Sequence, residues 1–172
     1  TNNLCIITGG PGTGKTTILN ELITILERSG IKTALAAPTG RAAKRMEKST
    51  SRTAQTIHRL LEYGASMGDD DDFLGLRFNK DNPIDAEAVI IDESSMVDVF
   101  LLCALLKAIE PGTRVIFTGD ADQLPSVGPG NVLRDMIDSG YIPVARLTEV
   151  FRQKGNIAHC AHGINDGVVP DL

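Results

Sequence analysis

The stretch LCIITGGPGTGKTT, residues 4–17, decides the fold. An apolar run at 4–8 leads directly into a glycine-rich turn, and the turn ends in Lys15 and Thr16. This is the spacing G-x-x-x-x-G-K-[ST], in which backbone N–H groups and the start of a helix surround phosphate groups. We therefore predict a strand, a phosphate-binding loop and a helix over about residues 14–28.

Short apolar runs alternate with helical patterns along the rest of the chain, as in βαβ units. Further strands are expected at 33–38, 88–93, 114–120 and 145–152, and helices at about 40–48, 53–62 (with Thr53 as N-cap), 98–109 and 130–140. The turn residues and DDDD run of 63–85 predict an exposed excursion. We expect a single α/β domain over 1–172, with a mostly parallel sheet and helices on both faces.

Composition limits the classes of function. A chain of 172 residues with 42% hydrophobic and 23% charged residues can form one globular core. Three cysteines without CxxC spacing argue against disulfides and zinc and fit a reducing, cytoplasmic setting. No apolar run is long enough to span a membrane. Because the chain begins without Met, we expect it to be a piece of a longer protein.

The net charge of −5 counts against a nucleic-acid partner, but the charge is unevenly distributed. Residues 41–59 contain a single acid, Glu47, and six basic residues: Arg41, Lys44, Arg45, Lys48, Arg52 and Arg59. This basic stretch is either a binding face or a solvated helix surface, and charge alone does not decide between them.

The glycine-rich loop predicts a site for the β- and γ-phosphates of a nucleotide. Lys15 would add positive charge, and the Thr16 hydroxyl would bind Mg²⁺. The predicted nucleotide-binding residues are Gly10, Pro11, Gly12, Thr13, Gly14, Lys15, Thr16 and Thr17.

Two later strands end in polar residues suited to hydrolysis. Asp92 would hold Mg²⁺ opposite Thr16, and Glu93 would orient or deprotonate the attacking water. Adjacent acids at this place favour hydrolysis over transfer to a hydroxyl substrate. Asp120 and Gln123 follow the strand at 114–120, at the sheet edge where such folds bind ligands, and Gln123 would contact the γ-phosphate.

Six motifs together resemble the first motor domain of superfamily-1 helicases. In chain order they are GGPGTGKT, APTGRAAKRM, TIHRLL, VIIDESSMVD, FTGDADQLPSVGPG and LTEVFRQ. Their detailed form is similar to the RecD family, which moves 5′ to 3′ on single-stranded DNA. The resemblance runs from residue 4 to 170. It implies a RecA-like P-loop NTPase fold, ATP and Mg²⁺ as cofactors, and a second RecA-like domain that completes the site.

The resemblance also implies residue roles. Lys15, Glu93, Gln123 and Arg152 would be catalytic, with Arg152 reaching the γ-phosphate to stabilise the transition state. The DNA backbone would be contacted by Pro38, Thr39, Gly40, Arg41, Thr56 and His58. Few aromatic residues are available for base stacking, so these contacts would be independent of sequence. RecD-like helicases carry a strand-separating pin where this chain has its excursion, although the DDDD run would repel phosphate.

Two other functions are compatible with parts of the sequence. One is a P-loop small-molecule kinase or stand-alone NTPase, against which the pair Asp92 and Glu93 with Gln123 argues. The other is a nucleotide-gated module that holds DNA or a protein without turnover, against which Glu93 argues. Without a second motor domain, we expect these residues to bind nucleotide weakly, hydrolyse it poorly and not unwind DNA. The pathway, including recombination or repair partners, stays open.

Overall fold

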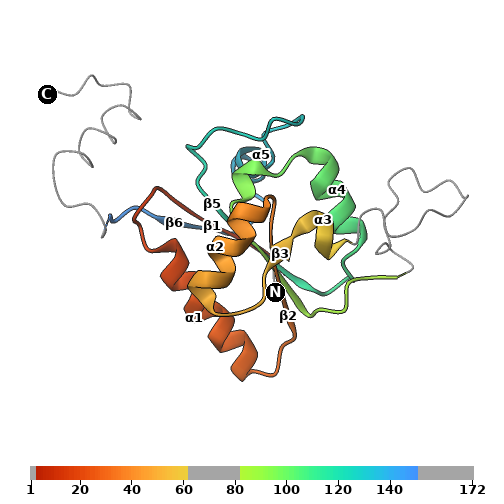
Figure 1. Ribbon diagram of the computed structural model, residues 1–172. Coiled ribbons are helices and arrows are strands. Elements are labelled where there is room, and N and C mark those ends of the chain that lie inside the picture. The colour runs from red at the N-terminus through yellow and green to blue at the C-terminus, as the bar shows by residue number, and fades with distance from the viewer. Residues whose placement is uncertain (1–2, 62–81, 151–172) are drawn as a thin grey trace, which may run out of the picture.

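The computed structural model describes residues 3–61 and 82–150 (Figure 1). Predictions that fall on other residues lie outside this part of the chain, among them the role of Arg152 and nearly all of the excursion. Within the described ranges, no helix has both the length and the apolar character needed to cross a bilayer.

Twelve elements lie within residues 3–61 and 82–150, and all but the short strand β3 and the 3₁₀ turn η1 correspond to elements that the sequence predicts. They are β1 Leu4–Gly9, α1 Lys15–Arg28, β2 Thr33–Ala37, α2 Gly40–Thr50, β3 Gln55–Thr56, α3 Ile57–Leu60, β4 Ala88–Ile91, the 3₁₀ turn η1 Ser94–Met96, α4 Val99–Lys107, β5 Arg114–Gly119, α5 Val132–Asp138 and β6 Val144–Leu147.

The strands form one six-stranded sheet in the order β3-β2-β4-β5-β1-β6, and every pair is parallel. The predicted α/β fold with a parallel sheet is therefore confirmed. The last strand begins at Val144 and ends at Leu147, so it is shorter than the predicted 145–152.

The predicted helix over 53–62 is wrong in its first half. Gln55 and Thr56 form a short edge strand that pairs with the end of β2. Helix α3 then occupies a single turn, and its N-cap is Thr56 instead of Thr53. Pairing with the open edge of the sheet satisfies backbone groups that a longer helix would have used, so tertiary context decides this segment.

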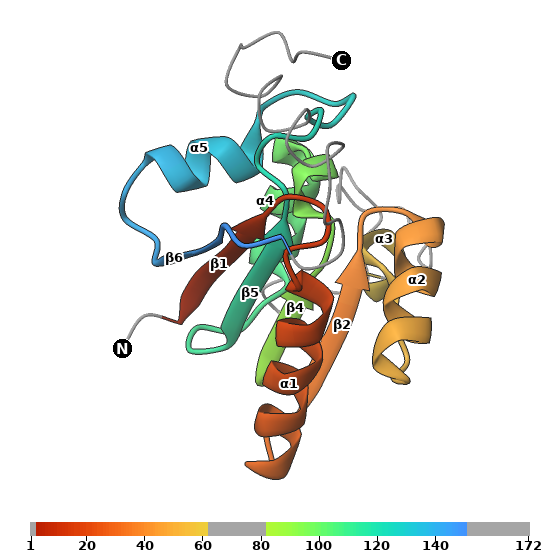
Figure 2. The same ribbon diagram turned by 90° about the vertical axis from the view of Figure 1, so that its left-hand side faces the viewer.

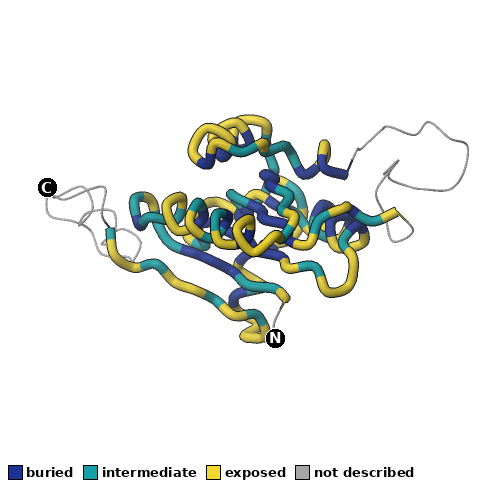
Figure 3. The backbone as a smooth tube through the Cα atoms, turned by 90° about the horizontal axis from the view of Figure 1, so that it is seen from below, coloured by how far each residue is buried: buried dark blue, intermediate teal, exposed yellow. Residues whose placement is uncertain are grey.

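Alternate side chains of the central strands enter two separate cores. Ile7, Ile90 and Ile116 pack with α1 and with Met46 of α2. Ile6, Ile91 and Phe117 face the opposite side, against α3, α4 and α5. Figure 2 shows these helices on the two sides of the sheet, and Figure 3 shows the buried strands between more exposed outer layers. Burial on both faces explains why the strands read as continuous apolar runs.

The parallel arrangement places the carboxyl ends of all six strands at one edge of the sheet. β1 ends there in the glycine-rich loop, β2 in Pro38 and Thr39, β4 in Asp92 and β5 in Asp120. Segments far apart in the sequence are thus brought together at the edge where α/β folds bind ligands.

Candidate nucleotide site and nucleic-acid face

The loop between β1 and α1 has the backbone that its glycines predict. Gly12 and Gly14 have φ angles of 81° and 86°, a left-handed conformation that a side chain disfavours. Gly9 is also confined, because a Cβ there would lie 2.7 Å from both the Leu147 carbonyl oxygen and Thr13 Oγ1. The Thr13 hydroxyl donates to the Gly10 carbonyl at 2.9 Å and closes the turn. The chain is therefore shaped for a close approach to a ligand.

Lys15 begins α1 and folds back over this loop. Its Nζ donates to the carbonyl oxygen of Gly9 and, at 2.9 Å, to that of Gly10. Burial lowers the pKa of the Lys15 ammonium, while the charges of Asp120 and Asp92 raise it. The ammonium thus donates to loop carbonyls and lies within electrostatic reach of two carboxylates at the strand ends. Phosphate oxygens would offer it stronger, charge-assisted partners in the same place.

Asp92 is fixed by both strands that flank β4. Its backbone N–H donates to the Ala36 carbonyl of β2 at 2.9 Å. The Thr118 hydroxyl of β5, which is only 1% exposed, donates to Asp92 Oδ1. The carboxylate has a second oxygen, Oδ2, for a cation, and Thr16 lies exposed in the first turn of α1. A hydroxyl and a carboxylate are hard oxygen ligands that suit Mg²⁺.

Glu93 departs from the strand that the sequence predicts. β4 ends at Ile91, and Glu93 has φ 53° and ψ 40°, where it caps the 3₁₀ turn η1. A left-handed non-glycine residue costs about 1 to 3 kcal/mol and is typical of functional sites. The side chain is 17% exposed and forms an ion pair with Arg45 of α2. The left-handed backbone of Glu93 and its ion pair with Arg45 together direct the carboxylate toward α2 in this structure.

Gln123 lies exposed beyond the end of β5, and a buried carboxylate holds its amide. Gln123 Nε2 donates to Asp120 Oδ2 at 3.2 Å, and Asp122 N donates to Asp120 Oδ1 at 3.1 Å. Asp120 itself is 4% exposed. The Ala121 N–H donates to Thr8 Oγ1 of β1 at 3.3 Å. This loop therefore contacts the strand that leads into the phosphate-binding loop.

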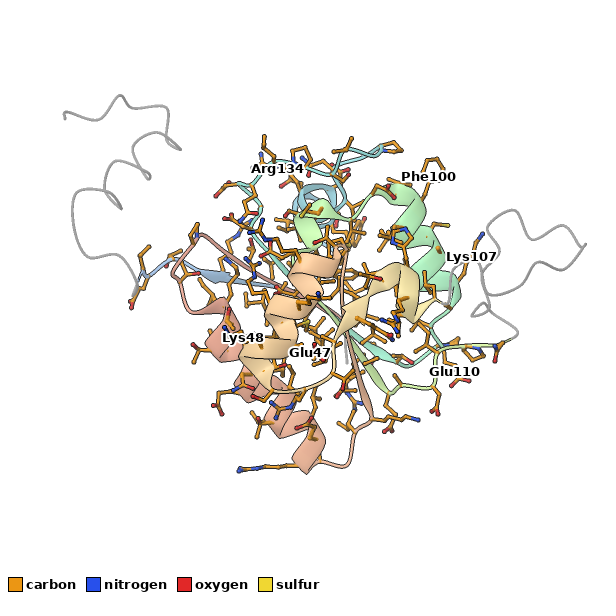
Figure 4. The ribbon with its side chains drawn as sticks, in the orientation of Figure 1. Glu47, Lys48, Phe100, Lys107, Glu110 and Arg134 are labelled. Carbon is orange, nitrogen blue, oxygen red and sulfur yellow. The ribbon has the colours of Figure 1, made fainter. Side chains whose placement is uncertain are left out.

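The loop after β5 also contacts the start of α4 and helix α5. A Cβ on Gly128 would lie 2.2 Å from Asp98 Oδ2, so only glycine fits without movement. Asp98 caps α4 through the Leu101 N–H at 2.7 Å. Arg134 of α5, labelled in Figure 4, donates to the Ala121 carbonyl at 3.3 Å. These contacts join the loop to both helices.

The predicted DNA residues lie at the ends of two adjacent strands. Thr39 caps α2 by accepting from Ala42 N at 3.2 Å, and Thr56 caps α3 by accepting from Arg59 N at 3.1 Å. Because Ala37 pairs with Thr56 across β2 and β3, the two caps share one edge. Pro38 is half-buried, and the exposed residues beside the caps are Gly40, Arg41 and His58.

The basic stretch divides into residues with different partners. The Arg52 side chain is engaged by other residues of the protein. It donates to both Glu27 carboxylate oxygens, at 2.8 and 2.7 Å. It also donates to Asn20 Oδ1, Thr24 Oγ1 and the Thr50 carbonyl. Arg45 faces Glu93. The remaining basic residues of the stretch are exposed: Arg41, Lys44, Lys48 and Arg59.

Three residues at the site were given no such role by the sequence. The sequence places Arg45 only in the basic stretch, Asp120 only at the sheet edge, and Thr118 only in a core strand. Each depends on which strands are neighbours, and β2 and β5 both flank β4. A polar residue one position before the end of a buried strand is the available signal for Thr118.

Comparison with known proteins gives a consistent result. Residues 1–129 match the family described as AAA domain. The chain is 41% identical over 171 residues to the ATP-dependent RecD2 DNA helicase of Deinococcus radiodurans, covering 98% of this chain and 22% of that protein. It is 35% identical over 188 residues to the RecBCD enzyme subunit RecD of Mycolicibacterium smegmatis, covering 95% and 33%. This chain therefore spans a third or less of those relatives' length.

A solved structure shows the same fold. The crystal structure of Bacteroides Pif1 bound to ssDNA superposes with a TM-score of 0.67 and 28% identity, covering 98% of this chain and 44% of that one. The resemblance to RecD-like helicases and the RecA-like fold are thereby confirmed, and neither alternative function is favoured. By its family match, its relatives and its fold, the chain belongs to the AAA domain family and is a RecD-like superfamily-1 helicase motor domain.

Proposed function

We propose that the chain provides one half of an ATP·Mg²⁺ site whose hydrolysis drives movement of a longer protein along single-stranded DNA. One observation carries this proposal: the phosphate-binding loop, Asp92 with Glu93, and the basic start of α2 follow β1, β4 and β2 at one sheet edge. The relatives' names, which include an ATP-dependent DNA helicase, support the same function.

The proposed chemistry assigns a role to each group near the phosphates. The loop N–H groups and the Lys15 ammonium bind the β- and γ-phosphates. Thr16 and Asp92 would hold Mg²⁺, which neutralises charge on the phosphate oxygens when it is bound. The Thr118 hydroxyl orients the Asp92 carboxylate, as outer partners of metal ligands do.

Hydrolysis itself requires a base for the attacking water. In the proposed step, the water oxygen bonds to the γ-phosphorus, its proton goes to the Glu93 carboxylate, and the bond to the β–γ bridging oxygen breaks to release ADP. Gln123 contacts the γ-phosphate from the loop after β5, and Arg152, outside the described residues, would stabilise charge in the transition state.

DNA is proposed to bind across the ends of β2 and β3. The backbone N–H groups at the start of α2 and the Arg41 guanidinium suit a phosphate, and Thr39 and Thr56 retain hydroxyl hydrogens to donate. His58 and Pro38 would complete this face. The exposed basic residues of α2 supply the local positive charge that the net charge of −5 conceals.

Because the relatives are three or more times longer than the matched region, the complete activity belongs to a longer protein. We propose that a second RecA-like domain closes over the nucleotide and that this chain alone turns over ATP poorly. A cytoplasmic location and partners in recombination or repair are further parts of the proposal, and the relative named as a RecBCD enzyme subunit supports the presence of protein partners.

ATP turnover by the full-length protein, with and without single-stranded DNA, tests this function. We expect strong stimulation by DNA and loss of turnover in Glu93→Gln, which keeps the side chain's shape but removes its basicity. Turnover that is indifferent to DNA would instead support a stand-alone NTPase. Turnover that survives Glu93→Gln would remove this carboxylate from the mechanism.

A further inference from the structure

The ion pair between Arg45 and Glu93 joins the two faces of the proposed motor. Arg45 lies on α2, the helix whose N-terminus is the proposed DNA contact, and Glu93 is the proposed base. The connection follows from topology, because β2 and β4 are neighbours and the residues after each strand meet at the same edge. We propose that Arg45 is a positioning residue that holds Glu93 in a resting direction until DNA binds at α2, which rests on the proposed function.

The geometry explains why the pair restrains hydrolysis. Glu93 must offer a carboxylate oxygen to the attacking water, but its Oε1 is engaged by the Arg45 guanidinium. The Glu93 side chain is 17% exposed and the Arg45 side chain 63% exposed, so water screens the pair in part and its worth is on the order of 1 kcal/mol. Breaking the pair therefore adds to the barrier for hydrolysis when DNA is absent.

Arg45 also lies close to the phosphate-binding loop. Its charge lowers the pKa of the Lys15 ammonium, in addition to the larger effect of burial. The guanidinium is therefore within electrostatic reach of the nucleotide, although it comes from the helix proposed to touch DNA.

Helix α2 connects the proposed DNA contact at its N-terminus to Arg45 in its middle. Thr39 is bonded to Ala42 and Ala43 at the N-terminus, and Ser51 N bonds to the Glu47 carbonyl at the other end. Arg45 lies between these points, within the continuous helix. At its N-terminus α2 packs on the sheet through a small cluster of Ala37, Ala42 and Ala43. These buried alanines hold the N-terminus of α2 against the end of β2.

The test uses ATP turnover by the full-length protein with Arg45→Ala, at saturating ATP, with and without a single-stranded oligo-dT. We expect the DNA-free kcat to rise about three- to fivefold, as for the loss of an ion pair worth on the order of 1 kcal/mol. The DNA-saturated kcat and the KM for ATP should stay unchanged, so the stimulation by DNA falls. Arg45→Lys, which keeps the charge, should restore the low DNA-free rate.

A matched control is Arg28→Ala, which removes an exposed arginine at the far end of α1, about 20 Å along the helix from the loop. It should leave both rates as in the wild type. If Arg45→Ala unfolds below the assay temperature, Arg45→Gln carries the same test with a longer polar side chain.

The outcomes separate this inference from the proposed function. A DNA-free kcat for Arg45→Ala equal to or below that of the wild type would overturn the restraint. A raised KM for ATP with unchanged kcat would also overturn it, because Arg45 would then be a phosphate ligand. If the wild type shows no stimulation by DNA, the proposed function itself fails, and if Glu93→Gln stays active, the Glu93 carboxylate is not the base and Arg45 has nothing to restrain.

Discussion

Replacing Thr118 by Val tests how the Asp92 carboxylate is held. Thr118 is 1% exposed, and its hydroxyl donates to Asp92 Oδ1. Valine has nearly the same shape, so the substitution removes the hydrogen bond without leaving a cavity. A hydrogen bond to a charged group contributes about 1.5 to 3 kcal/mol, which corresponds to roughly ten- to a hundredfold in an equilibrium or rate constant. Outer partners of metal ligands show losses of similar size.

The measurement is ATP turnover by the full-length protein as a function of Mg²⁺ concentration. Thr118→Val should shift half-saturation by Mg²⁺ to about ten- to a hundredfold higher concentration. Thr113→Val is the matched control, because Thr113 lies just before the other end of β5 and its hydroxyl donates to the Ala86 carbonyl at 3.3 Å. If both variants show the wild-type dependence on Mg²⁺, the Thr118 hydroxyl does not orient a metal ligand and the reasoning is refuted.

Three further outcomes are expected. Lys15→Ala should weaken ATP binding by at least about tenfold in calorimetry, because a charge-assisted contact to phosphate is lost, and unchanged affinity would contradict this role. Arg52→Ala should lower the Tm at pH 7. Because the hydrogen bond from Arg52 lowers the pKa of Glu27, the part of the stabilisation that comes from this pair is full above the ordinary value of 4.5 and disappears as the pH falls through the lower folded value. The Tm difference should therefore shrink in strong acid to what the contacts of Arg52 with Asn20, Thr24 and Thr50 contribute, and a difference as large in strong acid as at pH 7 would count against the pair. Gly128→Ala should cost about 1 to 3 kcal/mol of stability in denaturant unfolding, because its Cβ would collide with Asp98, and an unchanged midpoint would show that the loop adapts freely.

The parts of the fold that local sequence determines were predicted well. The apolar run, the glycines and Lys15 specify β1, the loop and α1 within a few consecutive residues, and the structure begins α1 at Lys15. The apolar strands β2, β4 and β5 were found because burial on both faces leaves continuous apolar runs. The ends of the strands were predicted less accurately. β4 ends at Ile91, and Glu93 leaves the sheet because it adopts a left-handed conformation at the site.

The features that were missed depend on contacts between distant segments. The pairing of Gln55 and Thr56 with β2 overrides a helical pattern, and no local signal indicates it. The ion pair of Arg45 with Glu93 requires β2 and β4 to be neighbours, which the order of elements along the chain does not determine. The separation of Arg52 from the exposed basic residues likewise depends on α1 lying beside the end of α2.

The most direct test of the central claim is movement along DNA. The full-length protein is given ATP and single-stranded DNA that carries streptavidin on a biotin at its 3′ or its 5′ end. We predict ATP-dependent displacement of streptavidin from the 3′ end, as for a motor of the 5′ to 3′ type, and no displacement with Glu93→Gln. Displacement from neither end, while DNA still stimulates hydrolysis, would contradict the claim that the energy of ATP drives translocation.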